Sequence, residues 1–190
     1  MGVSPTSMSM EYHEALLLVL KSAESPIRGR TAVQKMTYFC SLKVGSPKEW
    51  GYRPHYYGPY SDLVALGLQD LVQMGYVVEA AEHLPSNRVV YTYSLTKDGR
   101  AMAKAIETHQ KKSQVSRIRE VVHECMRTSH EDVNVLSWAA KVYFVVTANS
   151  DKLTVGRAME EAKSLGWKLA PGEIEKGVKL LQELRLVRVS

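Results

Sequence analysis

Three segments, RGRTAVQK (residues 28–35), YRPHYYGPYS (52–61) and GYVV (75–78), follow one another in the first half of the chain. The first predicts the start of a basic helix and the second predicts an aromatic loop. The third follows an apolar helical pattern over 61–74 and predicts the beginning of a strand. A second strand pattern covers 88–95, after turn residues at 85–87. The predicted order is therefore helix, loop, helix and β-hairpin.

Residues that can cap helices indicate where the predicted helices begin and end. A first helix is expected over 9–21. Thr31 is the expected N-cap of the second helix, Ser61 that of the third and Thr96 that of a fourth, because a hydroxyl can accept a hydrogen bond from the first turn. Gly75 follows the third helix, where a left-handed residue commonly ends a helix. The local signals thus agree with the order of elements.

This order is typical of a winged helix, so we expect a mainly α fold with small β-hairpins (α+β) and a winged helix-turn-helix. Residues 115–127, 133–148, 153–165 and 171–184 predict further helices, and 186–189 predicts a terminal strand. LQDL at 68–71 precedes one strand and LQEL at 181–184 precedes the other, although chance could explain so short a match. We expect two winged-helix-like halves, with domains over 1–112 and 113–190.

Composition predicts a globular protein, and the absence of catalytic motifs predicts that it is not an enzyme. The 190 residues are 45% hydrophobic and 24% charged, with a net charge of +5. The sequence has no apolar run of membrane-spanning length and no signal-peptide pattern, so we expect a cytoplasmic protein without membrane association. Cys40 and Cys125 lack metal or redox spacing, and no phosphate loop or nucleophile elbow is present. We expect no enzymatic activity, no metal site and no cofactor.

A pair of motifs in the first half resembles a known group of proteins. Gly29-Arg30, Gln34-Lys35 and the segment 57–61 fit the pattern G-R-x-x-x-Q-K followed downstream by Y-G-P-Y-S. In these motifs the chain resembles small prokaryotic winged-helix proteins and, more distantly, Panacea-type antitoxins. YSLTKDGR at 93–100 is similar to the strand-to-helix junction of multidrug-type and phenolic-acid-type winged-helix repressors. The resemblance covers roughly 10–110 and implies a winged-helix core, a prokaryotic source and binding rather than catalysis.

Basic residues point to duplex DNA as one partner. Residues 26–60 hold six lysines and arginines and one acid, Glu49. The third helix of a DNA-binding winged helix usually reads base edges, but 61–74 contains no cation and two aspartates. We therefore expect phosphate contacts and shape readout by a transcriptional regulator. The predicted DNA-binding residues are Arg28, Arg30, Lys35, Arg53, His55, Arg88, Lys97 and Arg100. Arg30 and Lys35 could instead pair with carboxylates such as Glu14 or Asp62.

The alternative function is a protein-interaction module, antitoxin-like or adaptor, because tyrosine combines an apolar ring with a polar tip. Its predicted partner-binding residues lie in the loop and on the third helix: Tyr56, Tyr57, Tyr60, Gln69 and Gln73. The tyrosines would equally suit a packed loop. Helical periodicity places Asp62, Gln69 and Gln73 on the outer side of the third helix. The same periodicity assigns Leu63, Val64, Leu68, Leu71 and Val72 to its buried side.

The two long helical patterns in the second half contain apolar residues that would be buried in one of two ways. They could form a homodimer interface or the core between the two halves. The residues are Val121, Val122, Leu136, Ala139, Val142, Tyr143 and Val146.

Overall fold

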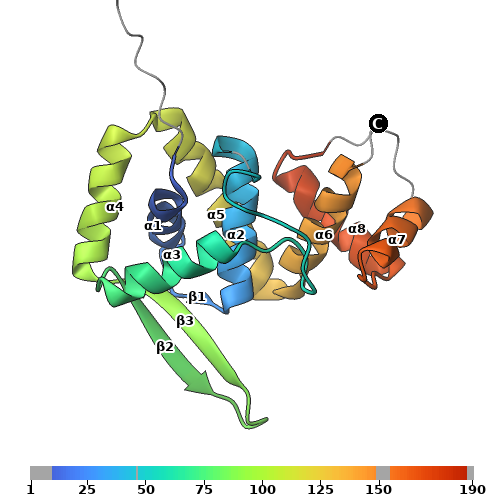
Figure 1. Ribbon diagram of the computed structural model, residues 1–190, viewed down its shortest axis with the longest axis horizontal. Coiled ribbons are helices and arrows are strands. Elements are labelled where there is room, and N and C mark those ends of the chain that lie inside the picture. Colours follow the sequence, from blue (N-terminus) through green and yellow to red (C-terminus); the bar gives the residue numbers. More distant parts are fainter. Residues whose placement is uncertain (1–9, 46, 149–154, 188–190) are drawn as a thin grey trace, which may run out of the picture.

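The computed structural model describes residues 10–45, 47–148 and 155–187. The described residues form helices and a small antiparallel sheet (Figure 1). In chain order the elements are α1 (Tyr12–Ser22), β1 (Ile27–Arg28), α2 (Arg30–Val44), α3 (Asp62–Gln73), β2 (Val77–His83), β3 (Val89–Leu95), α4 (Lys97–His109), α5 (Lys112–Glu131), α6 (Asn134–Ala148), α7 (Val155–Ser164) and α8 (Pro171–Glu183). The predicted mainly helical α+β class is confirmed.

Helix α1 lies at the centre of the N-terminal elements (Figure 1). Its residues 15–20 are all buried, which an amphipathic surface helix would not allow. It contacts α2, α3, α4, α5 and β3. The apolar run of α1 therefore forms the middle of the core around which the other helices pack.

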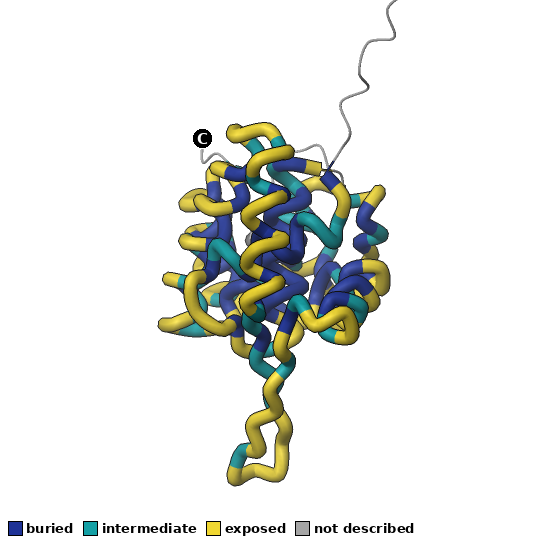
Figure 2. The backbone as a smooth tube through the Cα atoms, turned by 90° about the vertical axis from the view of Figure 1, so that its left-hand side faces the viewer, coloured by how far each residue is buried: buried dark blue, intermediate teal, exposed yellow. Residues whose placement is uncertain are grey.

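The sheet has the strand order β1-β3-β2, with every neighbouring pair antiparallel. Val77 pairs with Leu95 next to the core, whereas His83 pairs with Val89 at the far end. The β2–β3 hairpin projects away from the helices, and its outer part is exposed (Figures 1 and 2). Asn87 has a φ of 59° in the predicted turn. The hairpin is thus confirmed and extends beyond the body of the protein.

Most predicted helix boundaries hold. Ser61 accepts a hydrogen bond from the Val64 N–H, and Thr96 accepts one from Gly99, so both are N-caps as predicted. Gly75 has a φ of +77° and follows α3, also as predicted. Thr31 is wrong as the N-cap of α2, because the helix begins at Arg30.

The cap of α2 is Gly29, whose φ is +97°. Its N–H donates to the Tyr91 carbonyl at 2.8 Å, so the chain leaves strand β1 directly at this residue. A left-handed backbone is needed to turn from the strand into the helix, and glycine adopts it without strain. The sheet contact, which lies far away in sequence, displaces the start of α2 to before Thr31.

The buried side of α3 is predicted with one error. Val64, Leu68 and Leu71 are buried and Val72 packs partly against them. Leu63 is wrong, since it is 40% exposed. It lies at the edge of the helix over Gly51, where a Cβ on the glycine would approach the Leu63 side chain at 3.3 Å. Leu63 covers the preceding loop instead of entering the core.

The second half packs against the first. Helix α5 contacts α1 and α2, and α6 contacts α2 and α8. The apolar residues assigned either to a dimer interface or to the core lie inside the chain: Val121, Val122, Leu136, Ala139 and Val142 are buried, and Tyr143 and Val146 pack partly buried against them. Their burial makes them core residues and leaves none of the buried five accessible to a second chain.

The predicted terminal strand is wrong for the part that the structure describes. Leu186 and Val187 are not in a strand, and Arg188 and Val189 lie outside the described residues. The Arg185 N–H donates to the Gln182 carbonyl and the Leu186 N–H to the Leu181 carbonyl, both at 2.8 Å. Arg185 has a φ of 53°. This pattern is a Schellman cap, so the chain folds back on α8 rather than extending.

In the described part of the chain no hairpin follows α8, and a second winged-helix-like half stays a prediction. The predicted boundary at 112 falls at the first residue of α5, after the break at 110–111, and the division into two domains stays a prediction. None of the helices within the described ranges combines the length and the apolar character needed to cross a bilayer.

Candidate binding pocket

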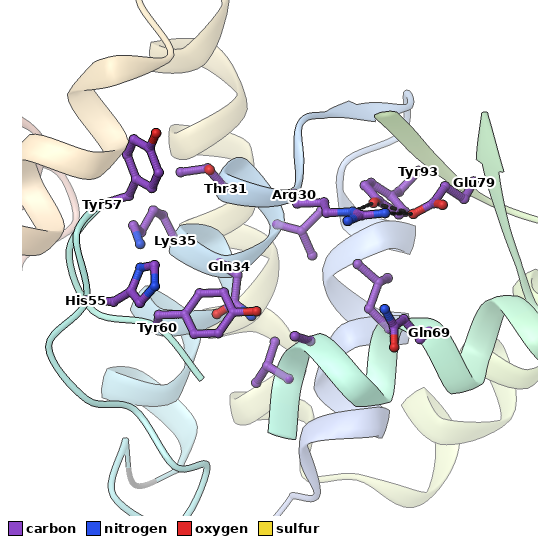
Figure 3. A pocket seen from close by; sticks show the side chains of 14 residues that line it. Arg30, Thr31, Gln34, Lys35, His55, Tyr57, Tyr60, Gln69, Glu79 and Tyr93 are labelled. Carbon is purple, nitrogen blue, oxygen red and sulfur yellow. Dashed lines mark hydrogen bonds and ion pairs between the residues drawn. The ribbon is translucent and has the colours of Figure 1, made fainter. Parts of the chain in front are cut away.

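A pocket with a volume of about 140 Å³ lies where the first turns of α2, the start of α3, the aromatic loop and the sheet meet (Figure 3). Throughout, the aromatic loop means residues 52–61. The pocket is lined by Arg30, Thr31, Val33, Gln34, Lys35, His55, Tyr57, Tyr60, Val64, Ala65, Leu68, Gln69, Glu79 and Tyr93. The two sequence motifs, separated along the chain, thus form two walls of one pocket.

Gln34 and Lys35 hold the aromatic loop against α2. The Gln34 side-chain amide donates to the Ser61 carbonyl at 2.9 Å and accepts from the Ser61 N–H at 3.2 Å. The Lys35 ammonium donates to the Pro59 carbonyl at 2.7 Å. Pro59 and Ser61 are the buried part of the loop. Because their backbone groups need partners there, these two side chains supply the hydrogen bonds that a strand or helix would otherwise provide.

Further hydrogen bonds hold the aromatic loop in place. The Tyr52 hydroxyl donates to the Gln34 carbonyl at 3.0 Å, and the Ser61 hydroxyl donates to the Trp50 carbonyl. Arg53 and Tyr60 exchange backbone hydrogen bonds of 3.0 and 2.9 Å across the loop. The Y-G-P-Y-S motif is therefore held against α2 by hydrogen bonds and forms one wall of the pocket.

Lys35 is buried, with 1% of its surface exposed. Burial and, to a smaller extent, the nearby Lys141 ammonium together lower its pKa to about 7. A phosphate contact, predicted for Lys35 from sequence, does not fit this burial, because the DNA backbone stays outside a protein surface. Neither Glu14 nor Asp62 pairs with Lys35, whose acceptor is a carbonyl.

Arg30 occupies the opposite end of the pocket. Its guanidinium donates to the Tyr93 hydroxyl at 2.9 Å and to the Glu79 carboxylate at 3.3 Å, and it stacks 4.3 Å from the Tyr91 ring centre. The hydrogen bond to Tyr93 raises the pKa of Arg30. Burial and the hydrogen bond to Glu79 raise the pKa of Tyr93. Arg30 thus pairs with a carboxylate, as the alternative predicted, but the carboxylate is Glu79 from the sheet and not Glu14 or Asp62.

Of the other six predicted DNA-binding residues, two form ion pairs with carboxylates. Arg28 pairs with Glu82 at 3.0 Å, and Arg53 pairs with Asp62. The remaining four are exposed: His55, Arg88, Lys97 and Arg100. Among the described residues, Arg88, Lys97 and Arg100 have no ion-pair partner, and they lie on the hairpin and on α4. Of the eight residues, Arg30, Lys35 and His55 line the pocket.

The predicted partner-binding residues gather more closely. Tyr57, Tyr60 and Gln69 line the pocket, and Tyr57 is 57% exposed (Figure 3). Tyr56 is 72% exposed beside Tyr57 in the loop, with ring centres 4.9 Å apart. Gln73 lies outside the pocket on the exposed side of α3.

Sequence reasoning missed Gln34, Glu79 and Tyr93 as pocket residues. Gln34 belonged to the motif, and its place among apolar helix positions was a usable signal of burial. Glu79 and Tyr93 are directly paired across β2 and β3. Strand alternation alone could not join them, since the pairing depends on the register of the hairpin.

The second half of the chain supports the aromatic loop from behind. The Trp167 indole N–H donates to the His55 carbonyl at 2.6 Å. Gly58 has a φ of +93°, and a Cβ there would lie 3.0 Å from the Lys141 side chain. The position of the pocket wall thus depends on α6 and on the segment between α7 and α8. Within the described ranges, no group of three or more histidine, cysteine, aspartate and glutamate side chains is arranged to hold a metal ion.

Comparison with known proteins gives one informative match. No protein-family model matches the chain. Over 87 residues the chain is 36% identical to the uncharacterized protein YwgA of Bacillus subtilis strain 168. The matched segment is 46% of this chain and 51% of YwgA, so the chain spans about half the length of this relative. The architecture defines a mainly helical α+β protein with a small pocket between α2, α3, the aromatic loop and the sheet.

Proposed function

We propose that this chain is a non-enzymatic protein-interaction module built on a winged helix. Its binding surface is the exposed side of α3 together with the exposed tyrosines of the aromatic loop. The order α1, β1, α2, α3 and then the β2–β3 hairpin supports the winged-helix assignment. The resemblance in the G-R-x-x-x-Q-K and Y-G-P-Y-S motifs supports binding rather than catalysis.

The main observation behind the proposal is the exposed side of α3. This side presents Leu66, which is 55% exposed, followed by the exposed Gln69 and Gln73, and Met74 at the helix end is 67% exposed. Large apolar groups rimmed by amides are typical of protein interfaces, and tyrosines are enriched there. Tyr56 and Tyr57 add such groups on the other side of the pocket. A protein partner with apolar and hydrogen-bonding side chains matches this surface.

Charge argues against DNA on the same side. Helix α3 contains no lysine or arginine. The arginines nearest to it, Arg30 and Arg53, are already paired with Glu79 and Asp62. Phosphate binding in this region would require breaking those pairs, whereas a neutral protein surface would not.

Site-specific photo-cross-linking in the host cell tests the proposal. A benzophenone side chain would replace Leu66, Tyr56 or, as a matched control, the partly exposed Met102 on α4. We expect the same protein adduct from positions 66 and 56 and none from 102. Leu66→Asp should abolish the adduct formed at position 56. Equal adducts from all three positions, or adducts that nuclease removes, would contradict a protein interface at α3.

Helix α4 favours DNA binding as a second candidate function. Lys97, Arg100 and Lys104 are exposed, and their spacing of three and four residues places them on one side of this helix. None of the three has an ion-pair partner among the described residues. A spacing of three and four residues on a helix separates their Cβ atoms by roughly 5–6 Å, so the three cations lie next to one another and could contact a phosphate backbone together. Arg88 at the hairpin tip could add a further contact.

Fluorescence anisotropy with random duplex DNA, at about 50 to 200 mM salt, tests this candidate. Binding should weaken steeply with salt and disappear in a triple variant with glutamate at 97, 100 and 104. Reversing Arg28 and Arg30 should matter less, because Glu82 and Glu79 already neutralise them. Equal loss in both reversals would place the phosphate contacts elsewhere.

A further inference from the structure

We propose that the pocket beside Lys35 binds a carboxylate group carried on a short apolar stem. Such a group can come from an acidic side chain of a protein partner, in which case the inference rests on the proposed function. It can also come from a free small carboxylic acid. The chemistry that the pocket recognises is the same for both sources.

The first step is the unfilled donor capacity of Lys35. An ammonium has three N–H donors. The Pro59 carbonyl takes one, and no other acceptor among the described residues contacts this nitrogen. Figure 3 shows the Lys35 amine directed between His55 and Tyr57 at the edge of the pocket. A buried amine with unused donors facing a cavity is suited to an acceptor supplied from outside.

The second step is the charge around this nitrogen. Lys141 from α6 is the cation that acts on Lys35. The aromatic loop contributes His55, Tyr57 and Tyr60, while Arg30 lies on the same helix. Glu79 and Tyr93 from the sheet also line the pocket, but Glu79 is occupied by Arg30 and by the Tyr93 hydroxyl. Lys35 therefore lacks a carboxylate partner, and the charge balance of the pocket favours an anion.

The third step is size and polarity. A volume of about 140 Å³ is too small for a drug-sized ligand and admits one side chain or a small organic acid. Val33, Val64, Ala65 and Leu68 form an apolar part of the lining. One buried ammonium with neutral hydroxyl and amide neighbours matches a single negative charge better than a phosphate dianion. The geometry points to an aliphatic carboxylate.

Binding should couple to protonation. An anion near Lys35 favours its charged form, opposing the burial and the Lys141 charge that lower its pKa to about 7. The pKa of Lys35 should therefore rise when the carboxylate binds, and the complex should take up protons in slightly alkaline solution. A neutral molecule of the same shape would produce no such rise.

The test uses the full chain labelled with ¹³C-lysine, with butyrate as the probe and butyramide as the neutral control. NMR follows the Lys35 Cε resonance through a pH titration. We expect saturable binding of butyrate, a raised Lys35 pKa and at least about tenfold weaker binding of butyramide. Equal effects of butyrate and butyramide, or no response of Lys35, would overturn the inference. This measurement needs no substitution that endangers folding.

Two variants then separate the site from the proposed interface. Ala65→Leu fills the pocket wall without removing a charge and should abolish butyrate binding, whereas Ala101→Leu on exposed α4 should not. Leu66→Asp should leave butyrate binding unchanged even though it disrupts the proposed protein interface. Retained butyrate binding in Ala65→Leu would place the acid outside this pocket and overturn the inference.

The cross-linked partner distinguishes the source of the carboxylate. If Ala65→Leu also weakens the partner adduct, the acid belongs to the protein partner. If the adduct is unaffected while butyrate binding is lost, the pocket serves a free carboxylic acid. Absence of any partner adduct would count against the proposed function alone, because butyrate binding is measured on the isolated chain.

Discussion

Gln34 and Lys35 are adjacent residues whose polar groups both lie inside the protein. Gln34 is 4% exposed and makes two hydrogen bonds to Ser61. Lys35 reaches Pro59 in the same loop. Each buried polar head is tolerated because it binds backbone that would otherwise lack partners. At the scale of single residues, the first role of the Gln34-Lys35 pair is to hold the aromatic loop against α2.

Replacement of Gln34 by alanine should lower the free energy of unfolding by about 2 to 4 kcal/mol, because the buried Ser61 N–H and carbonyl both lose their side-chain partner. Urea unfolding measures the change. Gln69→Ala is the matched control, since Gln69 is exposed on α3 and should change stability by less than about 0.5 kcal/mol. A small effect of Gln34→Ala would mean that the loop does not depend on this contact.

Lys35 should make stability depend on pH. Its folded pKa of about 7 lies below the ordinary value of 10.5, so the unfolded chain binds more protons between these limits. Stability should therefore rise from about pH 7 to about pH 8.5, by at most ~1.4 kcal/mol per unit. Lys35→Met should remove this component of the slope. Denaturant unfolding of both proteins over that range measures it, and parallel curves would contradict the assignment.

At the scale of elements, the junction between the sheet and α4 depends on a close approach. The Thr96 N–H donates to the Tyr76 carbonyl at 3.0 Å, and the Thr96 hydroxyl donates to the Gly75 carbonyl at 2.8 Å. A Cβ on Gly99 would lie 1.9 Å from the Tyr76 carbonyl oxygen. The glycine of the T-x-x-G segment is thus required by packing of α4 against the start of β2.

Gly99→Ala should destabilise the fold by at least about 2 kcal/mol, because α4 must move away from the Tyr76 backbone. Gly172→Ala on α8 is the control, since a Cβ there meets nothing within 4 Å, and its effect should stay below about 1 kcal/mol. Thermal unfolding compares the two variants. Equal stability would show that the junction relaxes easily.

At the scale of the whole molecule, the aromatic loop lies between the two halves of the chain. Its front lines the pocket with Tyr57 and Tyr60, while its back contacts Lys141 and Trp167. The His55 carbonyl accepts from both the Gly58 N–H and the Trp167 indole. The geometry of a pocket in the first half therefore rests on helices of the second half.

Trp167→Phe should loosen the aromatic loop, because the indole donor to His55 is lost while an aromatic ring remains. Hydrogen exchange at the Gly58 and Tyr60 amides should become faster by about threefold to tenfold, equivalent to about 0.7–1.4 kcal/mol. Trp138→Phe on α6 is the control and should leave both amides unchanged. Equal acceleration in both variants would indicate general destabilisation instead.

Several features were predictable because their causes are local. Ser61 and Thr96 cap helices through contacts within three residues, and Gly75 relieves strain at its own backbone. Periodicity identified Val64, Leu68 and Leu71 as buried for the same reason. Thr31 failed as a cap because the strand contact at Gly29 acts from a distant segment. The prediction for Leu63 failed because helical periodicity takes no account of the loop that Leu63 covers.

The sequence by itself determined the helix periods, the caps at Ser61 and Thr96 and the hairpin, since these depend on neighbours along the chain. Only the tertiary structure decided that Arg30 faces Glu79, that Lys35 is buried, and that residues assigned to two different surfaces share one pocket. Those outcomes depend on hairpin register and on packing between distant segments. Ion pairs and hydrogen bonds form between residues that are close in space and can be far apart in sequence. The sequence therefore shows which residue can be charged or can donate, but not which residue it will contact.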